Sequence, residues 1–188
     1  GLSMPPAALE GALSYAKGFA AAHPGHAVGF TLIVDSPPNV CTLNYNTTDG
    51  TPWLVRDVNG NGRVDDGSEL FGSDTRLQSG RTATHGFEAL AELDENRDGV
   101  IDARDAAFSS LLLWSDVDGD RRSSPSELRP LSARVRSLST KWALEPRCDE
   151  RGNCERERGA FVDMTGRRGA VVDVYLRIGR APSLLTAR

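Results

Sequence analysis

Three short acidic segments dominate the middle of this 188-residue chain. They lie within residues 57–127, which hold 16 of the 26 acidic residues but only 7 of the 22 basic ones, a net charge of −9. Carboxylates at this density repel one another in a folded chain unless cations lie among them. The region is therefore expected to fold around bound metal ions.

Each segment can be aligned with the calcium loop D-x-[DN]-x-[DN]-G-x5-E. In that loop, positions 1, 3 and 5 supply side-chain oxygens, position 7 a backbone carbonyl, position 9 often a water-mediated contact, and position 12 a carboxylate. Oxygen ligands favour a hard cation such as Ca2+ over zinc or copper. One such segment alone could be a solvated turn, because tight turns also use Asp, Asn and Gly. Three segments in the same phase predict two or three calcium ions.

The middle loop, residues 94–105, matches the pattern best, with Gly99 at position 6 and the apolar Ile101 at position 8. Helical spacing of apolar residues on both sides predicts a full helix–loop–helix. The last position is Asp105, which is one methylene shorter than Glu and predicts weaker binding. The expected ligands are Asp94, Asn96, Asp98, the carbonyl of Val100, Asp102 and Asp105.

The first loop, residues 57–69, has its Glu at position 13 instead of 12. We infer that Gly67 marks a one-residue expansion that lets Glu69 turn inward, with Asp66 as the competing candidate. Pro52 argues against a long helix leading into this loop. The expected ligands are Asp57, Asn59, Asn61, the carbonyl of Arg63, Asp65 and Glu69.

The third loop, residues 116–127, has the most charge but carries Arg121 at position 6, where glycine is expected. A residue other than glycine in a left-handed conformation costs about 1–2 kcal/mol. We therefore rank calcium occupancy as highest in the middle loop, then the first loop, then the third. The expected ligands are Asp116, Asp118, Asp120, the carbonyl of Arg122 and Glu127.

The fold class expected from the sequence is α+β, with short strands at both ends around a central EF-hand-like region of acidic loops and helices. We expect a single domain over residues 1–188, with residues 53–131 as the EF-hand-like region and residues 132–188 as a β-rich C-terminal part. Helical spacing predicts helices at residues 7–22, around 87–93 and at 103–112. Apolar and β-branched runs predict strands at residues 28–34, 40–45, 53–55 and 135–144, and a hairpin from 160–164 and 170–178.

Cys148 and Cys154 bracket a short polar loop, so a disulfide between them is expected if the protein is secreted, and reduced thiols are the alternative. Cys41 is expected to be a small buried apolar residue. No apolar run reaches the length of a membrane helix, and the scattered basic residues disfavour nucleic-acid binding. The start of the chain does not match an export signal, so we expect any such signal to have been removed or to lie outside this sequence.

Several stretches of this region resemble a known group of proteins. They are residues 53–62 (WLVRDVNGNG), 65–72 (DDGSELFG), 86–94 (GFEALAELD), 114–116 (WSD) and 127–128 (EL). The region is similar to bacterial secreted EF-hand-like calcium-binding proteins, among them RTX-associated proteins, whose relatives include a module that cleaves itself when calcium binds, and myxobacterial secreted or lipid-anchored proteins. The resemblance supports Glu69 as a ligand, because the Glu of the first loop in that group also follows an Asp-Gly step. Arg121 departs from the glycine usual there.

The expected function is a secreted or cell-envelope module in which Ca2+ stabilises a structural scaffold or one that binds an extracellular or cell-surface protein. A lipid anchor on a segment outside this sequence is one expected way of holding it at the envelope. No catalysis is expected, because His85 has no nucleophile or carboxylate near it at a motif spacing. One alternative is self-processing at an Asp-Pro bond; none of the ten prolines follows Asp, which places such a bond upstream of Gly1. A second alternative is an accessory domain of a secreted hydrolase.

Overall fold

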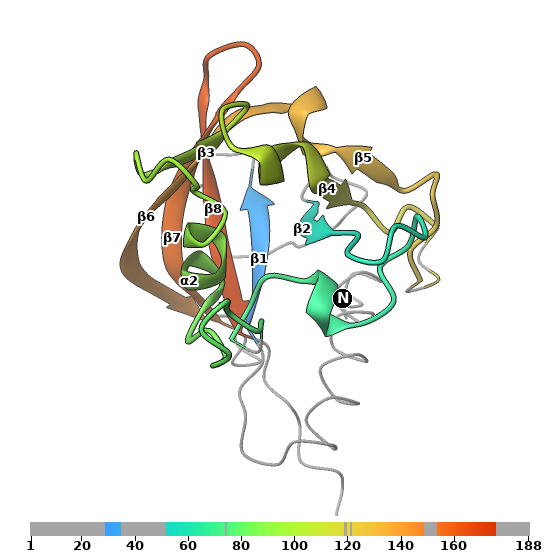
Figure 1. Cartoon of the computed structure of the whole chain (residues 1–188), viewed down its shortest axis with the longest axis horizontal. Helices are drawn as coiled ribbons and strands as arrows, with labels where there is room; N and C mark the ends of the chain where they lie inside the picture. Colours follow the sequence, from blue (N-terminus) through green and yellow to red (C-terminus); the bar gives the residue numbers. More distant parts are fainter. Residues whose placement is uncertain are drawn as a thin grey trace, which may run out of the picture.

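The computed structural model describes residues 29–34, 52–73, 75–118, 120, 122–148 and 154–175. Within these ranges eight strands form one sheet in the order β3-β6-β7-β8-β1-β2-β4-β5, and every paired neighbour is antiparallel (Figure 1). The strands are β1 (Gly29–Val34), β2 (Trp53–Arg56), β3 (Val100–Asp102), β4 (Leu111–Trp114), β5 (Leu128–Pro130), β6 (Val135–Cys148), β7 (Cys154–Asp163) and β8 (Arg168–Tyr175).

The three longest strands, β6, β7 and β8, form a meander at the C-terminal end of the described chain. A disulfide joins Cys148 to Cys154 where β6 turns into β7, so the predicted bridge is confirmed. The predicted hairpin is also present as β7 and β8, and Gly166 in its turn has a φ of +88°, which glycine adopts without strain.

One α-helix, α2 (Gly86–Ala91), lies across the face of β6, β7 and β8 (Figure 1). His85 caps its N-terminus, since Nδ1 accepts the backbone N–H of Glu88 at 3.1 Å. Phe87 is buried against β7 at Gly159, where an added Cβ would lie 2.5 Å from the Phe87 ring. The glycine therefore lets the helix approach the sheet closely, and His85 has a structural role as the N-cap of the helix.

The expected α+β class is wrong, because the described chain is built mainly of antiparallel strands and its one α-helix has six residues. The helix predicted at residues 103–112 is also wrong. Residues Ala106–Ser110 form a short 3-10 helix, η3, and β4 starts at Leu111. The apolar run of β4 pairs with β2 on one side and β5 on the other. Short apolar runs are ambiguous between helix and strand from periodicity alone, and strand pairing decided this one.

The central acidic region and the C-terminal part share this sheet. Residues 53–131 contribute β2, β3, β4 and β5, while residues 132–188 contribute β6, β7 and β8. A buried apolar cluster links the two parts and includes Leu54, Leu90, Ile101, Leu111, Leu138 and Phe161. The acidic loops are therefore held at the margins of a common core.

Other predictions have mixed outcomes. The helix near residues 87–93 and the strands at 28–34, 53–55 and 135–144 correspond to α2, β1, β2 and β6. The helix at residues 7–22, the strand at 40–45 and Cys41 lie outside the described residues. Across the described ranges, helices are too short to cross a membrane.

Candidate metal centre

The first loop folds around the carboxylate of Asp57. Asp57 Oδ1 accepts the backbone N–H groups of Gly60 at 2.7 Å and Asn61 at 3.1 Å, and Oδ2 accepts that of Gly62 at 2.7 Å. Both glycines have positive φ, +72° and +74°, which allows the chain to curl around this side chain. The carboxylate of the position-1 residue, Asp57, thus fixes the conformation of the turn by accepting three backbone N–H groups.

The polar side chains at positions 3, 5 and 9 of this loop meet at one point. The amides of Asn59 and Asn61 both donate to Asp65 Oδ2, at 3.1 and 2.5 Å. These hydrogen bonds, with Asn61 first, lower the pKa of the Asp65 carboxyl. The Arg63 side chain is exposed, and the backbone N–H of Arg63 donates to Asn61 Oδ1 at 2.9 Å. Three predicted ligand side chains therefore converge.

Glu69 closes the first loop. Its side chain is buried, and Oε1 accepts the N–H of Val58 at 3.0 Å while Oε2 accepts the N–H of Asp65 at 2.7 Å. The competing candidate, Asp66, instead caps the 3-10 helix η2 (Gly67–Glu69) by accepting the N–H of Ser68 at 2.8 Å. The one-residue expansion brings the position-13 carboxylate back to positions 2 and 9 of the loop.

The middle loop is organised in the same way. Asp94 accepts the N–H of Asp98 at 3.1 Å and the N–H of Gly99 at 2.8 Å, and Asn96 Oδ1 accepts the N–H of Asp98 at 2.9 Å. The buried Asp105 accepts the N–H groups of positions 2 and 9, which are Glu95 at 2.9 Å and Asp102 at 3.0 Å. Asp105 therefore closes this loop despite its shorter side chain, and Val100 begins β3.

An arginine that sequence analysis missed lies on the middle loop. Arg104 Nη2 is 2.7 Å from Asp98 Oδ2 and 2.7 Å from Asp102 Oδ2. The guanidinium lowers the pKa of the Asp102 carboxyl, and these carboxylates raise the pKa of Arg104. The guanidinium of Arg104 thus contacts two predicted ligands, and the available sequence signal was its position two residues after Asp102.

The third loop is closed by Glu127, which is buried. Its Oε1 accepts the N–H of Val117 at 2.7 Å, and its Oε2 accepts the N–H of Ser124 at 3.0 Å, again positions 2 and 9. Three carboxylates also converge here, with one oxygen from each within 4.8 Å of the others, and these belong to Asp116, Asp118 and Asp120. The Arg122 side chain is exposed, and Arg121 lies outside the described residues.

The predicted helix–loop–helix around the middle loop is wrong. Helix α2 ends at Ala91, before the loop, and the loop runs into β3 and the 3-10 helix η3. The first loop follows β2, and the third loop connects β4 to β5. Each of the three acidic loops therefore contains or adjoins at least one strand of the sheet.

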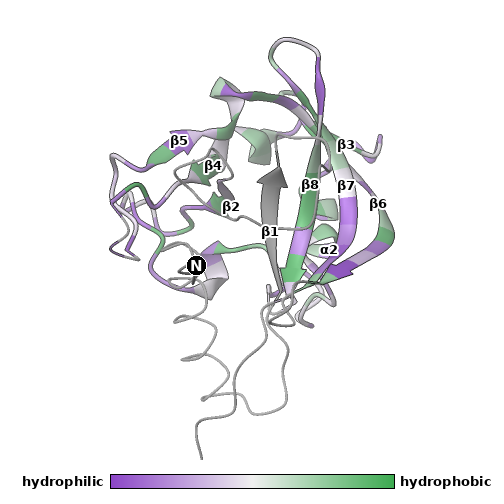
Figure 2. Cartoon of the chain, turned by 180° about the vertical axis from the view of Figure 1, so that it is seen from behind, coloured by the Kyte–Doolittle hydropathy of each residue, from purple (hydrophilic) through white to green (hydrophobic). Residues whose placement is uncertain are grey.

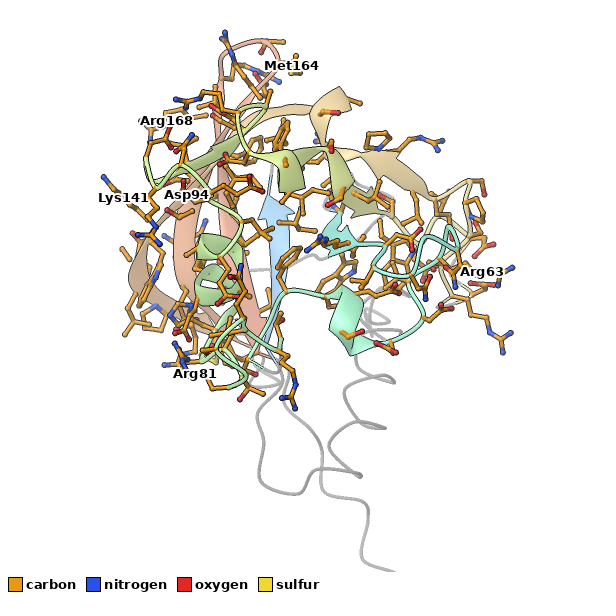
Figure 3. All side chains as sticks on the ribbon, viewed as in Figure 1. Arg63, Arg81, Asp94, Lys141, Met164 and Arg168 are labelled. Atoms are coloured by element: carbon orange, nitrogen blue, oxygen red, sulfur yellow. A yellow bond between two sulfur atoms is a disulfide. The ribbon has the colours of Figure 1, made fainter. Side chains whose placement is uncertain are left out.

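The loops occupy two separate places. The first and third loops lie side by side at the end of the sheet near β2, β4 and β5, in both Figure 1 and the reverse view of Figure 2. The middle loop lies on the other side of the molecule, as the labelled Arg63 and Asp94 show in Figure 3.

Comparison with known proteins identifies the family. The family model of the SPM domain matches residues 42–177, which cover all three loops and all of the sheet except β1. The chain belongs to the SPM domain family. It is also 41% identical over 124 residues to the iron-regulated protein FrpA of Neisseria meningitidis serogroup C. That match covers 65% of this chain and 11% of FrpA, so this SPM domain corresponds to a small part of that relative.

Proposed function

We propose that this SPM domain binds calcium and that the ions stabilise a scaffold for structural or partner-binding use outside the cell. The supporting observation is the shared closure of the three loops. In each loop a buried carboxylate, from Glu69, Asp105 or Glu127, accepts the N–H groups of positions 2 and 9. Three unrelated solvated turns would have no reason to share this arrangement.

The donor atoms fit calcium. The three loops present carboxylate and amide oxygens in alternating positions, and those of Asp116, Asp118 and Asp120 converge within 4.8 Å. Calcium accepts six to eight oxygen ligands in flexible geometry, whereas magnesium demands a tighter octahedral shell. Calcium would also offset the net charge of −9 over residues 57–127.

An extracellular, structural role is consistent with two further features. The disulfide between Cys148 and Cys154 favours an oxidising compartment, either secreted or at the cell envelope. Sensor EF-hands open a Met-rich apolar groove when they bind calcium. Here the two methionines are Met4 and Met164, both outside the acidic region, so calcium is proposed to stabilise the fold and to leave its surface unchanged.

Thermal unfolding tests this function. The midpoint should rise between chelator and millimolar calcium, because a ligand at about 100 times its dissociation constant adds roughly 2.7 kcal/mol. Magnesium should have a smaller effect. A variant with Asp118→Asn and Asp120→Asn is the matched control, because it keeps the turn hydrogen bonds but removes two of the three converging carboxylates, and its calcium-dependent shift should be smaller. A midpoint that calcium does not move in the wild type would refute the proposal.

A second candidate, supported by the sequence resemblance of residues 53–131, is the calcium-dependent self-cleavage of an RTX-associated module. The scissile Asp-Pro bond would precede Gly1, and this SPM domain would supply the calcium-dependent fold. A longer polypeptide that extends upstream of Gly1 should then release a new fragment on a denaturing gel when calcium is added. The same polypeptide with Glu69→Gln should release less. An intact band at all calcium concentrations would exclude this candidate.

A further inference from the structure

The first and third loops touch at equivalent positions. Counted from Asp57 and Asp116, position 8 is Val64 in the first loop and Ser123 in the third. The N–H of Val64 donates to Ser123 Oγ at 2.6 Å, and the Ser123 hydroxyl donates to the carbonyl of Val64 at 3.2 Å. One buried hydroxyl therefore satisfies both backbone polar groups of Val64, across 59 residues of sequence.

This contact lies between the residues that close the two loops. Asp65, next to Val64, donates its N–H to Glu69, and Ser124, next to Ser123, donates its N–H to Glu127. The path from Glu69 to Glu127 therefore consists of hydrogen bonds joined by two peptide links, Val64–Asp65 and Ser123–Ser124. Gly62 also lies near Pro125, since an added Cβ would be 3.7 Å from Pro125 Cγ.

The middle loop is excluded from this connection. Its position-8 residue, Ile101, is fully buried in β3 and pairs with Leu138 of β6. Its ends are fixed by the sheet and the core on the far side of the molecule from the first loop (Figure 3).

We propose that the first and third loops bind calcium cooperatively through the Ser123 hydroxyl, while the middle loop binds independently; this rests on the calcium-binding function proposed above. A bound ion tightens the closing carboxylate of its own loop, and Ser123 holds the neighbouring loop in the shape that binds the second ion. Coupling carried by one or two hydrogen bonds corresponds to about a two- to tenfold change in affinity.

Loop-specific amide signals provide the test. The N–H groups of Gly62 and Gly99 donate to the position-1 carboxylates Asp57 and Asp94, so their NMR signals report the first and middle loops separately. Calcium is titrated into the whole chain with and without Glu127→Gln, which disables the third loop. In the wild-type background, Glu127→Gln should raise the calcium concentration at the midpoint of the Gly62 signal about two- to tenfold. The midpoint of the Gly99 signal should not change.

The same comparison is then made in a Ser123→Ala background. There Glu127→Gln should no longer move the Gly62 midpoint, because the connection is already broken. Ser132→Ala, an exposed serine outside the loops, is the matched control and should retain the coupling. If Glu127→Gln unfolds the chain, Asp118→Asn with Asp120→Asn replaces it, since Asn keeps the turn hydrogen bonds and removes two charges.

The outcomes separate this inference from the proposed function. The coupling is overturned, while calcium binding stands, if Glu127→Gln leaves the calcium midpoint of the Gly62 signal unchanged. It is also overturned if Glu127→Gln shifts that midpoint equally with and without the Ser123 hydroxyl. If neither glycine signal responds to calcium, the proposed function fails and the coupling fails with it.

Discussion

Glu69→Gln tests the closure of the first loop without changing the volume of the side chain. Glu69 accepts two backbone N–H groups, and hydrogen bonds to a charged group contribute about 1.5–3 kcal/mol each. Glutamine has one acceptor oxygen, so it keeps one neutral bond of about 1 kcal/mol and turns an N–H group toward the other donor. We expect a loss of about 2–5 kcal/mol in unfolding free energy, a large share of a typical domain stability.

The measurement is urea unfolding in chelator, so that the result does not depend on calcium. Asp66→Asn is the matched control, because it also removes one negative charge but leaves a residue that caps a helix equally well. Asp66→Asn should lower the free energy of unfolding by less than about 0.5 kcal/mol. The argument for Glu69 would be refuted by equal losses of unfolding free energy in the two variants.

Three further outcomes are expected. Arg104→Gln should tighten calcium binding by the middle loop about two- to tenfold, read from the middle-loop amide signal, because two exposed ion pairs that compete with the ion are removed. Hydrogen bonds led by that of the Thr165 hydroxyl hold the pKa of Asp163 at about 2, below its ordinary value of 3.8. Its contribution to stability is complete above about pH 4 and is lost as the pH falls toward 2, so urea midpoints of the wild type and Asp163→Asn should converge over that range. Gly159→Ala should cost about 1–3 kcal/mol in urea unfolding, because the added methyl overlaps the Phe87 ring.

The acidic loops could be located from the sequence because their signal is local. The spacing of Asp57, Asn59 and Asn61 fixes which side chains turn inward, and the expansion at Gly67 correctly pointed to Glu69 as the side chain that returns to the start of the loop. Whether these residues bind metal stays a prediction.

The surrounding fold could not be predicted in the same way, because it depends on contacts between distant residues. Leu111–Trp114 has the apolar content of a helix segment and becomes β4 only because β2 and β5 lie beside it. The pairing of the first loop with the third rests on Ser123, whose polar side chain gives no apolar signal at position 8. The apolar Ile101 at position 8 of the middle loop pairs with Leu138 of β6 and not with another loop.

The position of β1 in the sheet has a consequence for folding during synthesis. Residues 29–34 pair with residues 170–175, so the first described strand cannot form this ladder until the last described strand has been synthesised. Until then β2 also lacks the neighbour that joins it to β8. Pairings this distant in sequence form slowly and leave strand edges exposed in the meantime. Strands β2, β4 and β5, which frame the first and third loops, can pair with one another once residue 130 has been synthesised, but they join β8 through β1 only after residues 170–175 follow.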